Sequence, residues 1–308
     1  MDRHIAMETF VRVIETGSFS AAAKQLNVGQ PSVSKVISQL EQWVGVKLLL
    51  RSSRSLTPTE AGLNFYHSAR RAIEEVDEAV ATARGAGSEL SGSLRVSASV
   101  CFGRLHIIRH LPRFLAEHPD LQLDMILDDR PINLLEEGVD VAIRSGNLPN
   151  SMVARKIGQA PRRVFATQAY FDSHPPILKP ADLRMHNVVI YPPDGGGRTW
   201  IFGRDGVEEK IDVDGRLKVT AAEGLREAVL ADIGIGVTSE WTFAPEYLSG
   251  EVTSRLDDWR LPTLDLWAVF SAGRMASAKA RAFATFVQDC VSDKIGGGSA
   301  TMPIGNSL

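Results

Sequence analysis

The chain begins with three short apolar patterns that have the period of an α-helix. The first lies within residues 5–16 and repeats at Met7, Phe10, Val11 and Ile14. The second, at 21–26, is rich in alanine, and the third runs from Pro31 to about residue 44 after a turn at 27–29. Small side chains let helices cross closely, so these patterns predict three packed helices with the connectivity of a helix-turn-helix.

The third predicted helix has one apolar face and one polar face. Its apolar stripe consists of Val33, Val36, Ile37, Leu40 and Val44. The polar face carries Ser34, Lys35, Ser38, Gln39 and Gln42. A face of hydrogen-bonding groups without an acidic cluster suits a helix that enters a DNA major groove. The simpler alternative for the serines and Gln39 is solvation of an exposed helix face.

Residues 47–62 read KLLLRSSRSLTPTEAG, with apolar ends and a polar tip. This pattern predicts a hairpin wing that presents Arg51 and Arg54. Thr57 and Glu60 have the spacing of a capping box, and Pro58 would occupy the first helical position, so we expect a long helix to begin here.

The long helix carries a narrow apolar seam with alternating spacings of three and four residues. Its members are Tyr66, Ala69, Ile73, Val76, Val80 and Ala83. This is the 3.5-residue repeat of a coiled coil, and its charged flanks favour pairing between two subunits over packing on the chain's own domain. Glycines and serines at 85–93 then indicate a linker.

From residue 94 onward, strand-like and helix-like patterns alternate. A first set predicts strands at 94–99, 121–127 and 139–145, with helices at 102–119 and 132–137. After 162–167 a second set predicts strands at 187–191, 198–202, 216–219 and 234–239 and a helix at 222–231. A strand at 264–270 and a helix at 276–291 return to the first set. The alternation predicts an α/β fold with parallel sheets in two lobes and a cleft between them.

Composition adds little beyond this picture. The 308 residues are 44% hydrophobic and 23% charged, as in soluble globular proteins, and the net charge of -3 requires any DNA-binding surface to be local. Cys101 and Cys290 are too few for a disulfide framework. Neither a signal peptide nor a long uncharged apolar stretch is evident, so we expect a cytoplasmic protein without a membrane span.

Other chemistry finds little support in the motifs. His106 and His110 share a helix face but have no local acidic or thiol ligand, so we expect neither a metal nor a cofactor. The glycines at 195–197 are not followed by the Lys-Ser/Thr of a P-loop and do not join a strand to a helix. We therefore expect them to lie at the rim of the cleft. An enzyme is the main rival class, but no G-x-S-x-G or H-E-x-x-H motif occurs. A solute-binding protein would explain the second half only.

Residues 10–62 resemble the DNA-binding region of LysR-type transcriptional regulators. The shared features are the alanines at 21–23, Gln30 with Pro31, Ser34, the GVKLL turn, both wing arginines and TEAG at 59–62. Further similarity lies in LRVSAS, LPRFLAEHPDLQLDM, EEGVDVAIRSG and REAVLADIGIGVTSEW. Gly29 occupies a helix-cap position where the family usually has Ser or Thr. Lys35 stands where Arg is frequent, so a single ammonium replaces a guanidinium that can form two parallel hydrogen bonds.

The resemblance implies a winged helix-turn-helix at 1–58, a dimerising linker helix at 59–90 and a two-lobed α/β effector domain at 91–293 that resembles periplasmic binding proteins. Lobe 1 would comprise 91–163 and 269–293, lobe 2 would comprise 164–268, and 294–308 would be a disordered tail. The implied DNA contacts are Ser20, Gln30, Pro31, Ser34, Lys35, Gln39, Arg51 and Arg54. The implied partners are promoter DNA, a small effector, RNA polymerase and further copies of the chain, as a dimer of dimers.

The family's effector lies between the lobes, and ligands of α/β folds bind beyond the carboxyl ends of strands. The predicted strand ends carry Ser99, Val100, Cys101, Phe102, Arg144, Ser145, Thr220 and Thr238. A helix N-terminus after Ser99 and the Arg144 guanidinium would favour an anionic or aromatic effector. The alternatives are an ion pair for Arg144, a helix cap for Thr220 and either a core position or a redox switch for Cys101.

Overall fold

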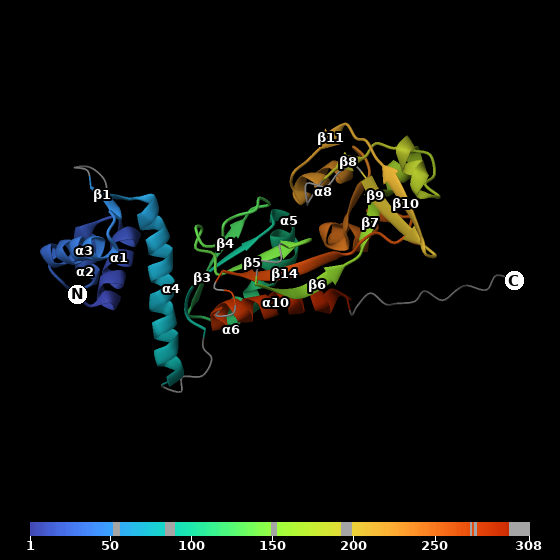
Figure 1. The fold of residues 1–308 in the computed structure, drawn as a ribbon. Coiled ribbons are helices and arrows are strands. Elements are labelled where there is room, and N and C mark those ends of the chain that lie inside the picture. Colours follow the sequence, from blue (N-terminus) through green and yellow to red (C-terminus); the bar gives the residue numbers. More distant parts are fainter. Residues whose placement is uncertain are drawn as a thin grey trace. The chain divides into compact units, whose positions relative to one another are not determined.

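The chain folds into two units, Met1–Ser93 with Ile132–Asp140 and Leu94–Pro131 with Val141–Leu308. The computed structural model describes residues 1–51, 56–83, 90–148, 153–191, 199–271, 273 and 276–295 (Figure 1). Within these ranges, no helix combines the length and the hydropathy that a membrane span needs.

The first unit contains the three predicted helices, α1 (Arg3–Thr16), α2 (Phe19–Gln25) and α3 (Gln30–Val44). Asp2 caps α1, and the Ser18 hydroxyl caps α2 by accepting the N–H of Ala21. Phe10, Ile37 and Leu40 are fully buried in their common core. The helical period therefore predicted the three helices, but the buried side of α1 is turned from the predicted one, because Ala6 and Val13 are buried while Met7 and Ile14 are half-buried.

A hairpin follows the three helices. Its strands β1 (Leu49–Arg51) and β2 (Leu56–Pro58) are antiparallel, and the long helix α4 (Glu60–Ala83) follows directly. The predicted cap at Thr57 is wrong, because Thr57 pairs with Leu50 inside the hairpin. Thr59 caps α4 instead, accepting the N–H of Gly62 at 2.9 Å. The wing tip, with Arg54, lies outside the described residues.

The buried side chain of Glu41 connects α3 to the start of the hairpin through hydrogen bonds. Its carboxylate is 5% exposed and accepts the N–H groups of Leu48 and Leu49 at 2.9 and 3.1 Å and the ammonium of Lys47 at 2.7 Å. Burial by itself raises the pKa of Glu41, but these donors together bring the pKa below its usual range. The charged carboxylate is therefore the form that the fold stabilises.

Glu41→Ala is expected to lower the free energy of unfolding of the winged domain by about 2–3 kcal/mol, because two buried N–H groups lose their acceptor. Glu41→Gln keeps one acceptor oxygen and should cost less. In the native protein the folded-state pKa lies below the unfolded one, so this stabilisation is present at neutral pH and is lost as pH falls through the folded-state pKa. Urea unfolding at pH 7 and pH 4 measures both effects, and equal losses for Ala and Gln would contradict the assignment.

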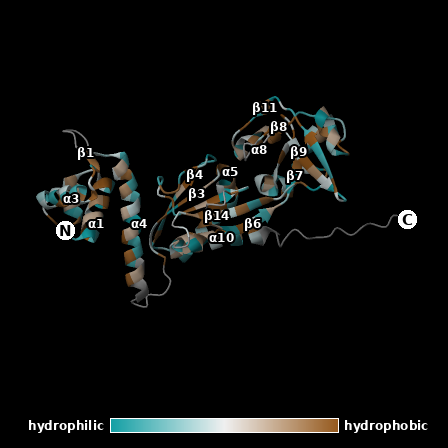
Figure 2. Ribbon diagram, in the orientation of Figure 1, coloured by the Kyte–Doolittle hydropathy of each residue, from teal (hydrophilic) through white to brown (hydrophobic). Residues whose placement is uncertain are grey.

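The seam of α4 is only partly covered within the first unit. Ala69 is buried and Tyr66 packs on the winged-domain core, whereas Val76 and Val80 are 47% and 42% exposed. Hydrophobic and hydrophilic positions are both distributed along the length of α4 (Figure 2). The far half of the seam is therefore an apolar stripe on the surface. The linker residues 84–89 lie outside the described part of the chain.

Residues 132–140 pack with the first unit, although they lie within the predicted effector domain at 91–293. The predicted helix at 132–137 is wrong, because the segment forms turns. The Asn133 side chain accepts the N–H of Leu135, and Gly138 has a φ of +63°, so both favour a turn over a helix. A Cβ on Gly138 would lie 2.2 Å from His67 Nδ1, and glycine therefore allows this close approach to α4.

Lobe 1 of the second unit is built on a five-stranded sheet with the order β4-β3-β5-β14-β6. The strands are β3 (Gly92–Ala98), β4 (Leu121–Leu127), β5 (Val141–Ser145), β6 (Ala154–Ala160) and β14 (Leu264–Phe270). β3 and β5 are parallel, but β14 is antiparallel to β5 and β6. The expected all-parallel sheet is wrong because the chain leaves this lobe through β6 and returns beside it through β14.

Helices cover the lobe 1 sheet in the predicted places. The expected helix at 102–119 is present but irregular, with α5 (Val100–Phe102), a π-helical turn (Gly103–Ile107), a 3-10 turn (Ile108–His110) and α6 (Leu111–Glu117) in succession. α10 (Ala278–Ile295) packs against β5 and β6 (Figure 1). It ends at Ile295, four residues beyond the predicted end of the helix and two beyond the predicted end of the effector domain, and the predicted tail from 296 onward lies outside the described residues.

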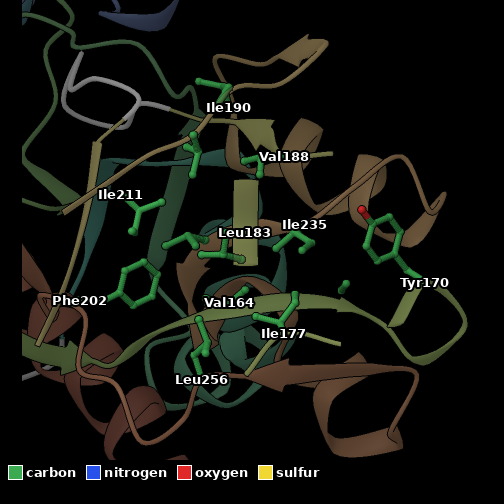
Figure 3. Close-up of a cluster of buried hydrophobic side chains, with 13 residues drawn as sticks. Val164, Tyr170, Ile177, Leu183, Val188, Ile190, Phe202, Ile211, Ile235 and Leu256 are labelled. Atoms are coloured by element: carbon green, nitrogen blue, oxygen red, sulfur yellow. The ribbon is translucent and has the colours of Figure 1, made fainter. Parts of the chain in front are cut away.

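Lobe 2 contains three small sheets. β7 (Arg162–Thr167) lies between β12 (Gly236–Ser239) and β13 (Val252–Arg255), antiparallel to both. The other two are the parallel pair β8 (Val189–Ile190) and β11 (Leu217–Lys218) and the hairpin β9 (Thr199–Arg204) and β10 (Val207–Asp212). The helices are α7 (Gln168–Ser173), α8 (Ala222–Leu230), α9 (Ala244–Ser249) and the 3-10 turns Pro180–Met185 and Glu240–Phe243. Figure 3 shows their core around Val164, Leu183 and Phe202.

The chain crosses between the lobes at Pro161 and near residue 263. β6 ends at Ala160 in the lobe 1 sheet, and β7 begins at Arg162 in lobe 2. β14 pairs with lobe 1 strands from Leu264 onward. The expected boundaries after 163 and 268 therefore shift to about 161 and 263, because each of these strands belongs to one sheet over its whole length.

Candidate DNA-binding helix and effector pocket

The predicted DNA contacts on α3 form one exposed face. Gln30, Pro31, Lys35 and Gln39 are exposed, while Ser34 is half-buried and its carbonyl accepts the Ser38 hydroxyl at 2.9 Å. Ser20 is exposed on α2, and Arg51 ends β1. The α3 contacts therefore lie together on the surface, as an interface with DNA requires.

The charge on this face is uniformly favourable to a phosphate backbone. Glu41, the one acidic residue of α3, is buried, so the exposed side of the helix carries Lys35 and no carboxylate. In the described part of the chain, Lys35 makes no ion pair. The Gly29 N-cap adds no side-chain bond to the first turn, so the α3 N-terminus keeps N–H groups for an outside acceptor.

A cavity of about 110 Å³ lies in the second unit, between the carboxyl ends of the lobe 1 strands and lobe 2. It is lined by Ser99, Cys101, Phe102, Asp128, Asp129, Arg144, Ser145, Arg162, Tyr191, Ala222, Val237, Thr238, Ser239, Trp241, Thr242 and Leu264. Six of the eight predicted effector residues are in this set. Val100, which begins α5, and Thr220, which is exposed, are not in it. Thr220 is not a cap either, because the N-cap of α8 is Ala221.

Arg144 is a half-buried cation of the pocket wall, which also includes the half-buried Arg162. Its guanidinium donates to Ser97 Oγ at 2.8 Å and to the Ile143 carbonyl at 3.2 Å. Among the described residues no carboxylate lies within 4.0 Å of it, so the alternative of an ion pair is absent there. Burial lowers the pKa of Arg144, and Asp128 and Asp129 at longer range oppose this effect. The guanidinium therefore keeps donors for an outside anion.

Asp128 and Asp129 are pocket residues that the sequence analysis missed. Asp128 accepts the Arg130 guanidinium in a bidentate pair, from Nη2 on Oδ2 at 2.7 Å and from Nε on Oδ1 at 3.2 Å, which lowers the pKa of Asp128 to about 2. Burial raises the pKa of Asp129, while a hydrogen bond from the Val100 N–H opposes it. The available signal was the DDR sequence at the carboxyl end of the predicted strand 121–127. The α5 N-terminus, expected to hold an effector carboxylate, thus faces the protein's own carboxylate.

Aromatic and polar contacts join the two lobes at the pocket. Phe102 of lobe 1 meets Trp241 of lobe 2 edge-on, with ring centroids 5.5 Å apart. His106 Nε2 lies 2.7 Å from the Trp241 carbonyl, in a buried contact. Arg104 pairs with Glu223 at 2.5 Å. His106 is thus an inter-lobe contact, and no group of potential metal ligands occurs in the described ranges.

Cys101 lies in the pocket wall with its thiol protonated. Burial raises the pKa of Cys101 to about 12, and the Glu223 carboxylate adds to the shift. At neutral pH the reactive thiolate is therefore a minute fraction of the population. These surroundings favour a core position over a redox switch for Cys101.

Comparison with known proteins agrees with this architecture. Residues 5–63 match the bacterial regulatory helix-turn-helix protein model of the lysR family, and residues 87–291 match the LysR substrate binding domain. An uncharacterized HTH-type transcriptional regulator of Haemophilus influenzae is 31% identical over 271 residues, covering 88% of this chain and 94% of the relative. An HTH-type transcriptional regulator of Xanthomonas campestris is 32% identical over 283 residues, covering 90% and 82%.

Solved structures show the same fold. CrgA, a LysR-type transcriptional regulator from Neisseria meningitidis, superposes with a TM-score of 0.57 at 26% identity, covering 94% of this chain and 98% of that one. Full-length LysG from Corynebacterium glutamicum, with bound effector Arg, has a TM-score of 0.59 at 22% identity and the same coverage. The chain therefore belongs to the LysR family of transcriptional regulators, with a DNA-binding helix-turn-helix and an effector-binding domain, and is not an enzyme.

Proposed function

We propose that the chain binds promoter DNA sequence-specifically in the cytoplasm and that a small anionic or aromatic effector in the pocket modulates this binding. The observation that carries the effector proposal is the half-buried guanidinium of Arg144, which lines the cavity. Among the described residues, no carboxylate lies within ion-pair distance of this guanidinium. Phe102, Tyr191 and Trp241 supply aromatic lining. LysG, a structural neighbour, holds a small charged effector, which supports a comparable use of this fold.

The DNA contacts follow from the exposed face of α3. Gln30 can pair with adenine through its amide, Pro31 can contact a thymine methyl and Lys35 can reach guanine or phosphate. Ser20, Ser34 and Gln39 complete the surface, and the wing arginines would reach the backbone or the minor groove. The groove-facing side of the helix supports this role because it carries no exposed carboxylate.

The exposed half of the α4 seam supports pairing of two subunits. Val76 and Val80 have a coiled-coil spacing and nearly half their surface in solvent, and a second copy of α4 would cover them. Two such pairs would then hold successive operator half-sites. An effector that changes the angle between the lobes would shift the spacing of the winged domains, and with it the access of RNA polymerase.

Selection from a random duplex pool, followed by footprinting of the selected site, tests the proposal. The full-length native protein is expected to enrich one sequence motif and to protect it. Small carboxylates and aromatic compounds that raise its melting temperature should change the length or position of the protected region. Failure to enrich any motif would refute sequence-specific binding, and a footprint that no stabilising compound alters would refute modulation by an effector.

A further inference from the structure

The pocket wall carries charged side chains of both signs, and two of these side chains do not form an ion pair with each other. Arg144 and Asp129 line the same cavity, interact at longer range and are separated by more than ion-pair distance. Asp128, beside them, is already neutralised by Arg130 at 2.7 Å. Glu223, also near Asp129, is paired with Arg104. Arg162 also lines the cavity and has an interaction of its own, whereas Arg144 and Asp129 are a cation and an anion of the cavity wall with no contact counter-ion among the described residues.

A purely anionic effector does not satisfy this arrangement. Its carboxylate would be attracted by Arg144, but the partly buried Asp129 would stay uncompensated and would repel the negative charge of the effector. A purely cationic effector would leave the charge of Arg144 uncompensated and would be repelled by it. A molecule with both charges gives each group a counter-ion and removes the electrostatic cost of their burial when it binds.

We propose that the effector is a small zwitterionic amino-carboxylate, with its carboxylate on Arg144 and its ammonium on Asp129. This inference rests on the proposed function and specifies the class of effector. The cavity of about 110 Å³ holds on the order of ten non-hydrogen atoms, which is the size of a medium-sized amino acid. Phe102, Val237 and Trp241 line the same cavity and offer apolar contacts to the remainder of the molecule.

The binding direction follows from the chain segments that carry the charges. Arg144 is held by Ser97 Oγ at the carboxyl end of the parallel strands, whereas Asp129 follows β4 and faces the first N–H of α5. The Val100 N–H supports the charged form of Asp129, which is the form that an ammonium pairs with. Once bound, the ammonium would lower the pKa of Asp129 toward its ordinary value.

The test compares matched compounds on the full-length protein by calorimetry. The panel contains the α-amino acids and short β- and γ-amino acids, each beside the carboxylic acid that lacks its amine and the amine that lacks its carboxylate, such as L-leucine, 4-methylpentanoate and 3-methylbutylamine. At least one zwitterion is expected to bind tenfold or more tightly than both of its matched compounds. If no zwitterion binds, or if the matched acid binds equally well, the proposal is overturned.

The Asp129→Asn variant provides a second readout. It removes the counter-ion while keeping the shape of the side chain, so affinity for the zwitterion should fall tenfold or more and affinity for the matched acid should rise. Asp120→Asn, an exposed carboxylate outside the pocket, serves as the matched control and should change neither. A loss of both affinities in Asp129→Asn would indicate a merely structural role. Acids that bind and alter the footprint, with no effect of Asp129→Asn, would overturn the zwitterion while leaving the proposed function intact.

Discussion

The Lys35→Glu variant is expected to bind the selected operator about a hundredfold more weakly than the native protein, or not measurably. Lys35 is exposed on the polar face of α3, where it is the single cationic side chain of the helix. A base contact in the major groove contributes roughly 1–3 kcal/mol, and reversing the charge adds repulsion from nearby phosphates. A total of about 3 kcal/mol corresponds to a hundredfold change in affinity.

The salt dependence of the remaining binding distinguishes a phosphate contact from a base contact. If Lys35 neutralises a phosphate, its loss should make the negative slope of log K against log salt shallower by about 0.9. If it reads guanine, discrimination between operator and mutated operator should fall while the slope changes less. A gel-shift titration at several salt concentrations measures both quantities.

A matched charge reversal in the second unit controls for net charge. Lys210→Glu changes an exposed lysine of β10 by the same two units of charge, outside the winged domain. It is expected to bind the operator like the native protein, and both variants should keep the native circular dichroism spectrum. Equal affinities of the Lys35 and Lys210 variants would remove Lys35 from the DNA-binding surface.

The periodic elements were predictable from the sequence because their pattern is determined locally. The buried face of α3 follows from the spacing of its apolar residues, and the pocket positions Ser99, Arg144 and Thr238 follow from the ends of apolar strands. Asp128 and Asp129 follow the predicted strand at 121–127 in the same way, so the negative wall of the pocket has the same local signal in the sequence.

Other features depend on contacts between distant segments. Thr59 replaces Thr57 as the cap of α4 only because Thr57 pairs with Leu50 across the hairpin. The antiparallel position of β14 likewise depends on the return of the chain from lobe 2. The β9–β10 hairpin is different, since Asp205 and Gly206 both have positive φ in a two-residue turn. An Asp-Gly turn of this type is a local signal that could have predicted the hairpin.

Arg144→Ala is expected to weaken binding of a carboxylate effector about a hundredfold, since the effector loses its charged hydrogen-bond donors in a partly buried site. The expected effect on stability has the opposite sign. Burial disfavours the charged form of Arg144, as its lowered pKa indicates, and no carboxylate in the described residues compensates for it at contact distance. The melting temperature of the effector-free variant should therefore equal or exceed that of the native protein, as is common where a site is built for a ligand rather than for stability.

Two further variants define what the guanidinium contributes. Arg144→Lys keeps the positive charge but loses the paired N–H donors of the guanidinium. If the contact with the effector carboxylate is bidentate, the affinity of this variant for the effector should lie between those of the native protein and Arg144→Ala. Arg109→Ala removes an exposed arginine outside the pocket and should bind the effector normally. Calorimetry with the carboxylate that most stabilises the native protein measures affinity, and thermal unfolding without ligand measures stability. If Arg144→Ala unfolds at a lower temperature and binds that carboxylate with native affinity, Arg144 supports the fold of lobe 1 and does not hold the effector.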